Sequence, residues 1–370
     1  MKVSLNTLND RSSWAKAGVR LPEYDVAAMR RATYREPIWV HLGAGNIFRA
    51  YIAALQQRLL NAGEAQRGIV AVDTFDVDNI RMIYGGYDNL TMSVTLNPNA
   101  TIDKEIIASV SEAMIAQPGE AADYARLRQI FTFPSLQMIS FTITEKGYAL
   151  RQINGDYLPV VAEDLAAGPD HPRHAMSIVT ALLLYRFQNG RHPLAVVSMD
   201  NCSHNGEKLK ASILTIAGEW EKKGFVPADF VAWLDDETKV SFPWSMIDKI
   251  TPRPDASVEE MLRKDGLQGL EPVITSKNTY IAPFVNAEES EYLVIEDDFP
   301  NGRPALEHAG FIFTDRDTVN KVERMKVCTC LNPLHTAMSV YGCLLGYTRI
   351  WQEMKDEDIV NLIKRVGYVE

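Results

Sequence analysis

The segment that most constrains the fold runs from Ile38 to Ala50 and reads Ile-Trp-Val-His-Leu-Gly-Ala-Gly-Asn-Ile-Phe-Arg-Ala. An apolar stretch leads into two glycines, and a helix-like run then continues through Leu60. Glycines in this context allow a tight turn and let backbone amides approach a pyrophosphate at a helix N-terminus. The pattern predicts a dinucleotide-binding unit, whose candidate cofactor-binding residues are Gly43, Ala44, Gly45, Asn46, Ile47, Phe48 and Arg49.

A second strand candidate supports this interpretation, although Phe48 stands where the usual fingerprint has a third glycine. The apolar stretch 68–72 follows the helical run and ends in Asp73. A carboxylate there can accept hydrogen bonds from the adenosine ribose hydroxyls, which favours NAD over NADP. Asp73 could equally be a turn residue, and Asp76 is a rival, because Asp73 lies farther from Gly45 than the usual ~20 residues.

Alternating strands and helices predict the architecture around this unit. Strand candidates at 90–95, 138–144 and 194–199 are separated by helical runs, such as the one over 175–188. Such alternation is typical of α/β proteins with a doubly wound, mostly parallel sheet. We therefore expect a Rossmann-like α/β fold, in which ligands bind beyond the carboxyl ends of the strands.

Composition limits the possible partners. The 370-residue chain has a formal net charge of −10 and no basic block, which argues against nucleic acid. Its opening residues lack the apolar core of a signal peptide, and no stretch approaches the ~20 apolar residues of a membrane span, so we expect a cytoplasmic protein with no membrane partner. We also expect a monomer or a small homo-oligomer. Its four cysteines are too few for a disulfide framework, and Cys328-x-Cys330 lacks the partners of a zinc site, so no metal is expected.

Polar residues follow two of the expected strands. Thr144 and Glu145 close one strand, and Asn201 follows another. An amide at a strand end could donate to an alkoxide or carbonyl oxygen, or it could serve an Asx-turn. Asp248 lies shortly before a Thr-Pro pair, where its carboxylate could pair with a lysine, accept from substrate hydroxyls or cap a turn.

The segment 324–335 places a lysine, an amide and an imidazole close together. Asn332 followed by Pro333 predicts an N-cap and a first helical residue, with His335 on the same side of the first turn and Lys326 before the break. A lysine in an apolar pocket can lose its charge and act as a general base, while an amide and an imidazole hold the reacting oxygen. The alternative is a solvated lysine, a capping asparagine and a structural histidine.

These blocks together resemble the polyol-specific long-chain dehydrogenases and reductases, which include mannitol dehydrogenases and fructuronate and tagaturonate reductases. The resemblance covers most of the chain and rests on six blocks in the same order, at 43–50, 142–148, 200–206, 242–252, 292–304 and 324–335.

The resemblance implies roles for individual residues. Lys326 is the general base, Asn201 and Asn332 stabilise the oxyanion, and His335 hydrogen-bonds the reacting oxygen. Asp248 and Glu323 support the lysine or carry its proton outward. The remaining implied positions, at the cofactor, are Thr144 and Glu145.

The resemblance also implies two domains, an NAD-binding domain over 1–315 and the start of a helical substrate-binding domain over 316–370. Family members continue through a larger helical domain, so we expect a chain that is cut short. Five residues separate Lys326 from Asn332 where the family has four, and Pro333 replaces a small residue.

The implied activity is a metal-independent, NAD-dependent interconversion of a sugar acid or polyol and its keto form. D-Mannonate with D-fructuronate is the preferred pair, because the blocks 143–148 and 294–297 look most like the fructuronate reductase branch. Mannitol with fructose and altronate with tagaturonate are alternatives. A catalytically silent nucleotide-binding protein is an alternative of another class.

Overall fold

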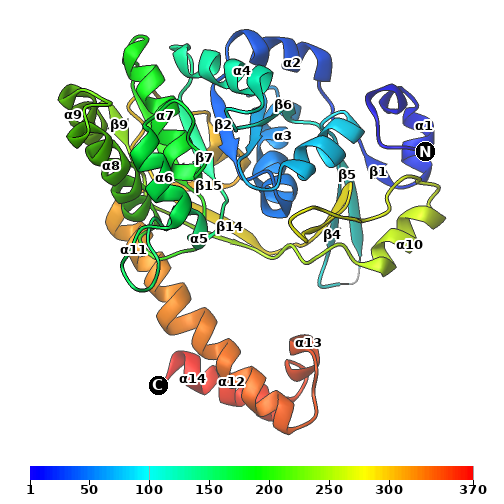
Figure 1. Ribbon diagram of the computed structural model, residues 1–370. Helices are drawn as coiled ribbons and strands as arrows, with labels where there is room; N and C mark the ends of the chain where they lie inside the picture. Colours follow the sequence, from blue (N-terminus) through cyan, green and yellow to red (C-terminus); the bar gives the residue numbers. More distant parts are fainter. Residues whose placement is uncertain (100, 370) are drawn as a thin grey trace. The chain divides into compact units, whose positions relative to one another are not determined.

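The computed structural model describes residues 1–99 and 101–369 and separates into two compact units, Met1–Phe313 and Thr314–Glu370. The first unit is built on a six-stranded, wholly parallel sheet with the order β6-β3-β2-β7-β8-β9 (Figure 1). Its strands are β2 (Trp39–Leu42), β3 (Ile69–Asp73), β6 (Val110–Ile115), β7 (Met138–Phe141), β8 (Leu194–Ser198) and β9 (Val240–Ser241). The predicted doubly wound α/β sheet is confirmed.

The strand order reverses next to β2. From β2 the chain builds outward through β3 and β6 on one side, and through β7, β8 and β9 on the other. Crossovers on the two sides diverge at this point and leave a crevice at the carboxyl edge of the sheet, where ligands of such folds bind.

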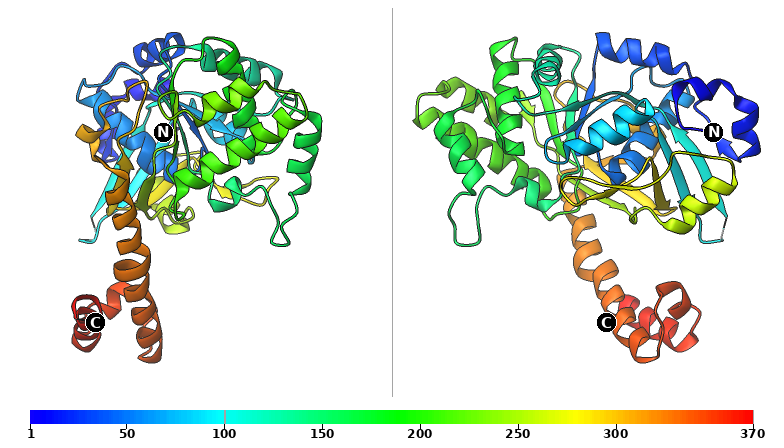
Figure 2. Two further views of the ribbon diagram at one scale, coloured as in Figure 1. Left: turned by 90° about the vertical axis from the view of Figure 1, so that its left-hand side faces the viewer. Right: turned by 45° about the vertical axis from the view of Figure 1, so that its right-hand side comes forward.

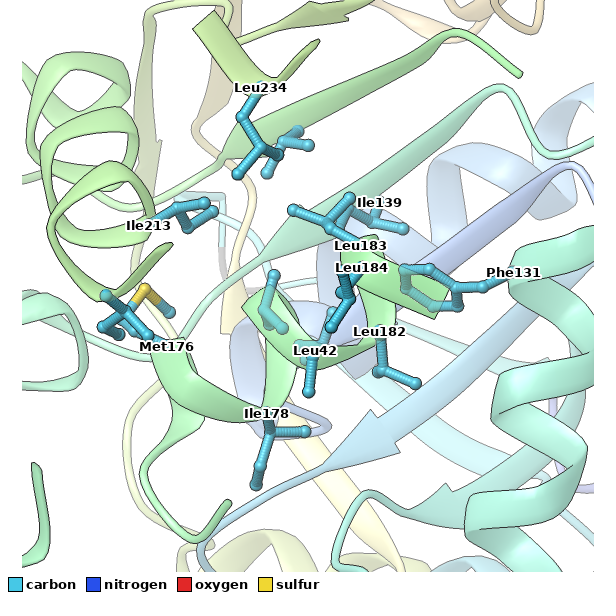
Figure 3. Packing of buried hydrophobic residues seen from close by; sticks show 14 of the residues in the cluster. Leu42, Phe131, Ile139, Met176, Ile178, Leu182, Leu183, Leu184, Ile213 and Leu234 are labelled. Atoms are coloured by element: carbon cyan, nitrogen blue, oxygen red, sulfur yellow. The ribbon is translucent and has the colours of Figure 1, made fainter. Parts of the chain in front are cut away.

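Side chains of the central strands alternate between two cores, because successive residues of a strand point to opposite faces. Figure 3 shows Leu42 and Ile139 packed against the leucines of α7 in the first core, which also includes residues of α4, α8 and α9. The helices on this face are α4 (Ala121–Thr132), α7 (Ala175–Gln188), α8 (Asn205–Lys222) and α9 (Ala228–Asp235).

The second core lies on the opposite face of the sheet. Trp39 and Met138 pack there against a helix that follows β2 and against a small sheet from later in the chain. These elements are η2 (Phe48–Ile52), α3 (Ala53–Asn61), β10 (Ser245–Lys249), β14 (Glu291–Glu296) and β15 (Phe311–Thr314). Both faces of the parallel sheet are therefore covered, as its continuous apolar strands require.

The strand expected at 90–95 lies outside the central sheet. It forms β4 (Thr91–Leu96), which pairs antiparallel with β5 (Ile102–Ile107) and parallel with β13 (Phe284–Glu288) in a separate four-stranded sheet, order β1-β5-β4-β13. The further short strands are β1 (Val19–Arg20), β11 (Val273–Ile274) and β12 (Tyr280–Ile281).

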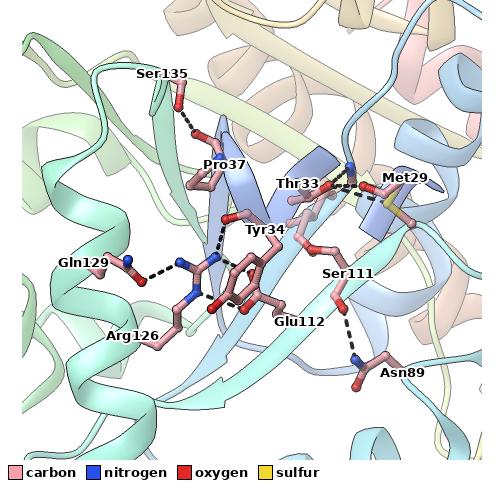
Figure 4. A network of polar contacts seen from close by, with 12 residues as sticks. Met29, Thr33, Tyr34, Pro37, Asn89, Ser111, Glu112, Arg126, Gln129 and Ser135 are labelled. Carbon is pink, nitrogen blue, oxygen red and sulfur yellow. Dashed lines mark hydrogen bonds and ion pairs between the residues drawn. The ribbon is translucent and has the colours of Figure 1, made fainter. Parts of the chain in front are cut away.

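Polar contacts attach the N-terminal helix α2 (Val26–Arg35) to the central sheet (Figure 4). Arg126 of α4 donates two hydrogen bonds of 3.0 Å to Glu112 of β6 and one of 2.7 Å to the carbonyl of Tyr34. The hydroxyl of Thr33 accepts from the backbone N–H of Gly68. The remaining helices of this unit are η1 (Leu5–Asn9), α1 (Arg11–Lys16), η3 (Asn79–Tyr84), η4 (Gly85–Tyr87), α5 (Glu145–Tyr148), α6 (Pro159–Ala167), α10 (Ala256–Lys264) and η5 (Leu306–Ala309).

The second unit is helical. Its first three segments, α11 (Arg316–Arg324), η6 (Met325–Cys330) and α12 (Leu331–Leu344), form one continuous helix (Figure 2). Two more helices follow, α13 (Ile350–Glu353) and α14 (Glu357–Tyr368), and Met338 packs against Ile359 and Ile363 to join α12 to α14. In the part of the chain that the structure describes, every helix is too short or too polar to cross a bilayer.

Candidate active site

A cavity of about 1240 Å³ lies at the carboxyl edge of the parallel sheet. It is lined by residues that follow β2, β3, β6, β7 and β8, so it occupies the crevice where the strand order reverses. The lining residues from these strand ends include Gly43, Gly45, Asn46, Ile47, Asp73, Thr74, Asp76, Gln117, Thr142, Ile143, Thr144 and Asp200.

The two glycines of the predicted turn are needed for different reasons. Gly43 has φ +98°, and a Cβ placed there would lie 2.2 Å from the carbonyl oxygen of Thr142. Only glycine fits such a conformation and such a close approach. At Gly45, by contrast, a Cβ would meet no atom of the described residues within 4 Å. The backbone at Gly45 is therefore open to the cavity, and a side chain there would occupy ligand space.

Three residues of the expected cofactor-binding run have side chains that lie in the interior, so only their backbone could meet a cofactor. Ala44 is fully buried, and Phe48 stacks on the imidazole of His41 with ring centroids 4.3 Å apart. Arg49 donates to the hydroxyl of Thr91, and burial lowers its pKa to about 10. Successive helical residues point about 100° apart, so only the first residues after the turn face the cavity.

Asp73 serves the turn and also lines the cavity. Its Oδ1 accepts hydrogen bonds from the backbone N–H groups of Phe75 (2.9 Å) and Asp76 (3.1 Å). Burial raises the pKa of Asp73 to about 6, although the two hydrogen bonds act to lower it. Both roles that the sequence left open are thus compatible with one carboxylate.

Two acceptor oxygens near Asp73 have no hydrogen-bond partner among residues 1–99 and 101–369. They are Oδ1 of Asp76 and Oδ1 of Asn79, and both residues line the cavity. The other oxygen of Asp76 accepts from the hydroxyl of Thr275 over 2.9 Å. Buried acceptors normally have a donor, and sugar hydroxyls would supply one. The open backbone at Gly45 and these acceptors fit a dinucleotide.

Asp200, which the sequence did not single out for a role, holds the wall of the cavity after β7. Its carboxylate accepts from the backbone N–H groups of Ile143 (2.9 Å) and Thr144 (3.1 Å) and from the hydroxyl of Tyr148 (2.6 Å). Burial raises the pKa of Asp200. An acid at the end of a central strand, directly before Asn201, was the signal that could have identified it.

The other strand-end candidates have diverse surroundings. The exposed carboxylate of Glu145 pairs with Lys208 of α8, whereas Thr144 lines the cavity. Asn201 is exposed just beyond the carboxyl end of β8. Asp248 lies within β10 opposite Tyr292 of β14.

The lysine segment contradicts the expected helix start at Asn332. The helix continues through η6, a π-helical stretch that contains Lys326, and Asn332 is the second residue of α12 rather than its N-cap. A proline ring normally clashes with the carbonyl four residues earlier, here that of Thr329. The widened turn of a π-helix relieves this clash, so Pro333 is accommodated without a break.

The π-helical stretch also changes which side chains share one side of the helix. Lys326 and His335 are nine residues apart, and at about 100° per residue of an α-helix they would lie on opposite sides. A π-turn absorbs one extra residue. The effective separation becomes eight residues, or about 80° once two full turns are removed. Glu323 lies three residues before Lys326, and Glu323, Lys326 and His335 all belong to the second unit.

Among the described residues, no group of three or more His, Cys, Asp and Glu side chains is arranged to hold a metal ion. Cys328 and Cys330 are both exposed on η6, with no such group around them.

The sheet order, the glycine turn and the acids beside it define the first unit as a Rossmann-type dinucleotide-binding domain. The sequence profile of the mannitol dehydrogenase Rossmann domain matches residues 37–308. The chain belongs to the mannitol dehydrogenase family, a family of oxidoreductases, which confirms the expected family and fold class.

Individual relatives extend this assignment. A D-mannonate oxidoreductase of Thermotoga maritima is 49% identical over 369 residues, which are 99% of this chain and 68% of the relative. A mannitol 2-dehydrogenase of Phaeosphaeria nodorum is 28% identical over 97% of this chain and 59% of its own length. The solved mannitol 2-dehydrogenase of Pseudomonas fluorescens, in a ternary complex with NAD and D-mannitol, is 28% identical with a TM-score of 0.76, covering 100% of this chain and 68% of that one. The chain thus spans about three fifths to two thirds of the length of these proteins.

Proposed function

We propose that the chain carries out an NAD-dependent interconversion of a sugar acid or polyol and its keto form, with D-mannonate and D-fructuronate as the preferred pair. The observation that carries the proposal is a dinucleotide-sized cavity at the glycine turn of a chain 49% identical to a D-mannonate oxidoreductase. Mannitol with fructose is the second candidate, because the solved mannitol 2-dehydrogenase has a similar fold over the whole chain.

The glycine turn and the acids after β3 would hold the cofactor. Gly45 lets the pyrophosphate approach the backbone at the helix N-terminus. Asp73 and Asp76 would accept hydrogen bonds from the adenosine ribose, and Thr144, which lines the cavity on the opposite side of β2, would lie toward the nicotinamide half. NAD bound in this way supplies a hydride acceptor at C4 of its nicotinamide.

The roles proposed for residues at the alcohol are those that the family resemblance implies. Lys326 takes the proton of the substrate hydroxyl, while the hydrogen on the carbon that carries this hydroxyl leaves as hydride. Amide N–H groups of Asn201 and Asn332 stabilise the negative charge that develops on the oxygen. His335 also hydrogen-bonds this oxygen, and its place about 80° from Lys326 around the helix supports a shared target. Glu323 and Asp248 support the lysine or carry its proton away.

We also propose a cytoplasmic location and a monomer or small homo-oligomer. The four cysteines, Cys202, Cys328, Cys330 and Cys343, are all free thiols, which supports a reducing compartment. The net charge of −10 disfavours nucleic acid as a partner.

Absorbance of the reduced nicotinamide tests the proposal directly. NADH should be oxidised by D-fructuronate faster than by D-fructose or D-tagaturonate, and NAD should be reduced by D-mannonate. Lys326→Ala should nearly abolish turnover in both directions, whereas Lys321→Ala, which removes an exposed lysine of α11, should leave it unchanged. If NADH quenches tryptophan fluorescence but no keto sugar or keto acid oxidises it, the chain is a silent nucleotide-binding protein.

The oxyanion assignment has its own test. Asn201→Ala should lower turnover by roughly 10²-fold or more, the scale of losing one preorganised donor, with NADH affinity nearly unchanged. A change of less than twofold would leave Asn201 as a turn residue only.

A further inference from the structure

A chain of buried polar groups runs beneath the glycine turn. The indole N–H of Trp39 donates to the hydroxyl oxygen of Ser140 over 2.7 Å, and the same oxygen lies 2.7 Å from Nδ1 of His41. On the other side of the ring, Nε2 lies 2.9 Å from the hydroxyl oxygen of Thr142, which donates over 2.9 Å to the carbonyl of Gly43. These groups come from β2 and β7, which pair side by side in the sheet.

The two end groups of this series of hydrogen bonds, the indole of Trp39 and the carbonyl of Gly43, determine where every proton lies. An indole N–H can only donate, and a carbonyl oxygen can only accept. Because the single proton of Thr142 goes to Gly43, its oxygen must accept from Nε2 of His41, so Nε2 carries a proton. Burial lowers the pKa of His41 to about 3, so the ring is neutral and Nδ1 accepts from Ser140. All donors therefore point the same way, from Trp39 toward the turn.

The carbonyl of the next residue, Ala44, is also held by hydrogen bonds. The oxygen of Ala44 accepts from the side-chain amide of Asn79 (2.7 Å) and from the hydroxyl of Tyr84 (2.9 Å). Both carbonyls inside the Gly43–Gly45 turn are therefore bonded to protein donors. In a planar trans peptide the N–H points opposite to the C=O. Fixing these two carbonyls leaves the turn with donors, rather than repelling oxygens, for a phosphate.

We propose that His41 is a positioning residue for the cofactor: in its neutral form with the proton on Nε2, it acts through Thr142 to keep the Gly43 carbonyl turned away from the phosphate site. The stacked ring of Phe48 fixes the imidazole plane, with ring planes 11° apart. This gives Phe48 a function at the place where the usual fingerprint has a third glycine. The inference rests on the proposed function, because it presupposes that the turn binds a dinucleotide.

Ser140 gives the sharpest test, because it is fully buried and does not line the cavity. Ser140→Ala leaves Nδ1 of His41 without its donor, so the other ring form becomes accessible and the hydrogen bond to Thr142 is lost part of the time. NADH affinity, measured by calorimetry, should fall about tenfold. The matched control is Ser109→Ala, which removes an equally buried hydroxyl. This hydroxyl donates to the carbonyl of Ala53, apart from the hydrogen bonds around His41, so the variant should leave NADH affinity unchanged.

A second pair of variants tests the link to the turn itself. Thr142→Val keeps the branched shape but removes the hydroxyl, and it should weaken NADH binding at least as much as Ser140→Ala. Thr142→Ser restores the hydroxyl and should recover most of the affinity. Thermal unfolding followed by circular dichroism establishes that each variant is folded before its affinity is compared.

Nitrogen NMR of histidine-labelled protein reads the ring form without any ligand. We expect one neutral His41 with the proton on Nε2, and a mixture of the two neutral forms in Ser140→Ala. A proton on Nδ1 in the wild type, or wild-type NADH affinity in folded Ser140→Ala and Thr142→Val, would overturn the inference. If the wild type itself fails to bind NADH, the proposed function fails instead, so the two failures are distinguishable.

Discussion

The carboxylate of Asp200 accepts a 3.1 Å hydrogen bond from the backbone N–H of Thr144, a residue that has φ +64° and ψ 162°. A β-branched residue rarely adopts positive φ, and such a conformation costs about 1–3 kcal/mol. Asp200 accepts from the neighbouring Ile143 N–H as well, so one carboxylate holds the two consecutive N–H groups that lead into the strained residue at the cavity wall.

Replacing Asp200 by Asn should therefore weaken the hydrogen bonds that hold the backbone of Ile143 and Thr144. The amide offers only one acceptor oxygen, and its NH₂ group would face a backbone N–H that needs an acceptor. We expect the free energy of unfolding to fall by about 1–3 kcal/mol, measured by urea denaturation, and NADH to bind more weakly. The control is Asp229→Asn, which breaks an exposed ion pair with Arg191 and should cost about 0–1 kcal/mol. Equal urea midpoints for wild type and Asp200→Asn would show that the strain is held elsewhere.

The two glycines of the turn should respond to substitution in opposite ways. Gly43→Ala places a Cβ against the Thr142 carbonyl at positive φ, so it should destabilise the fold by about 1–3 kcal/mol or more. Gly45→Val should leave the thermal midpoint nearly unchanged, because its side chain enters open space. It should nevertheless abolish detectable NADH binding in calorimetry, since the valine occupies the path of the pyrophosphate. Undiminished affinity in Gly45→Val would remove the turn from the cofactor site.

Asp73 predicts a pH dependence of NADH affinity. Burial raises its pKa to about 6, and the ionised carboxylate accepts hydrogen bonds from ribose hydroxyls better than the neutral acid does. NADH should therefore bind more tightly above pH 6 than below it, and near pH 6 binding should release a proton. Calorimetry in buffers of different ionisation enthalpy measures that proton.

The stability of the cofactor-free protein should change with pH in the opposite direction to NADH affinity. Because the pKa of Asp73 in the folded state lies above its ordinary value of 3.8, ionisation destabilises the cofactor-free protein as the pH rises through about 6. Asp73→Asn keeps an acceptor for the Phe75 N–H and removes the charge, so it should raise Tm at pH 8 and change it little near pH 4. The same variant should lose the pH dependence of NADH affinity; a dependence that persists would belong to another group.

The parallel sheet and the glycine turn could be predicted from the sequence because both depend on patterns of residues that are close together in the chain. Apolar strands separated by helical runs specify a doubly wound sheet, and Gly43 is required by its own φ and by a contact that any such turn makes. The direction of Phe48 and Arg49 could not be predicted as easily. It depends on the helix starting at Asn46 and widening into η2, and neither feature has a local signature.

Two other features of the site depend on residues that are distant in the chain or on ambiguous signals. The strained conformation of Thr144 is held by a carboxylate 56 residues later in the sequence, so no local pattern encodes it. The Asn332–Pro333 pair is typical of a helix start, but a π-turn before the proline suits the same two residues inside a continuous helix. Tertiary contacts and helix geometry decide what these residues do.

The π-turn predicts an unusual tolerance to deletion in the lysine segment. Removing Cys328 takes one residue out of η6 and should convert it to regular α-helix. Lys326 would then stand eight residues from His335, again about 80° away around the helix. Turnover of the deletion variant with a keto-acid substrate should stay within a few-fold of the wild type, and helix content by circular dichroism should be preserved. The deletion also restores the four-residue spacing between Lys326 and the asparagine that the family shows.

Exchanging Met325 and Lys326 provides the matched test of register, because composition and length are unchanged. In the exchanged variant the effective separation of the amine from His335 becomes nine residues, or about 180° around the helix, so the amine lies on the side opposite His335. Turnover should fall as far as in Lys326→Ala, while NADH affinity, which depends on the first unit, stays at the wild-type value. If the exchanged protein instead turns over as fast as the wild type and the deletion variant is inactive, the π-turn does not set the register, and the base of the reaction must be sought at another residue, with His335 as the first alternative.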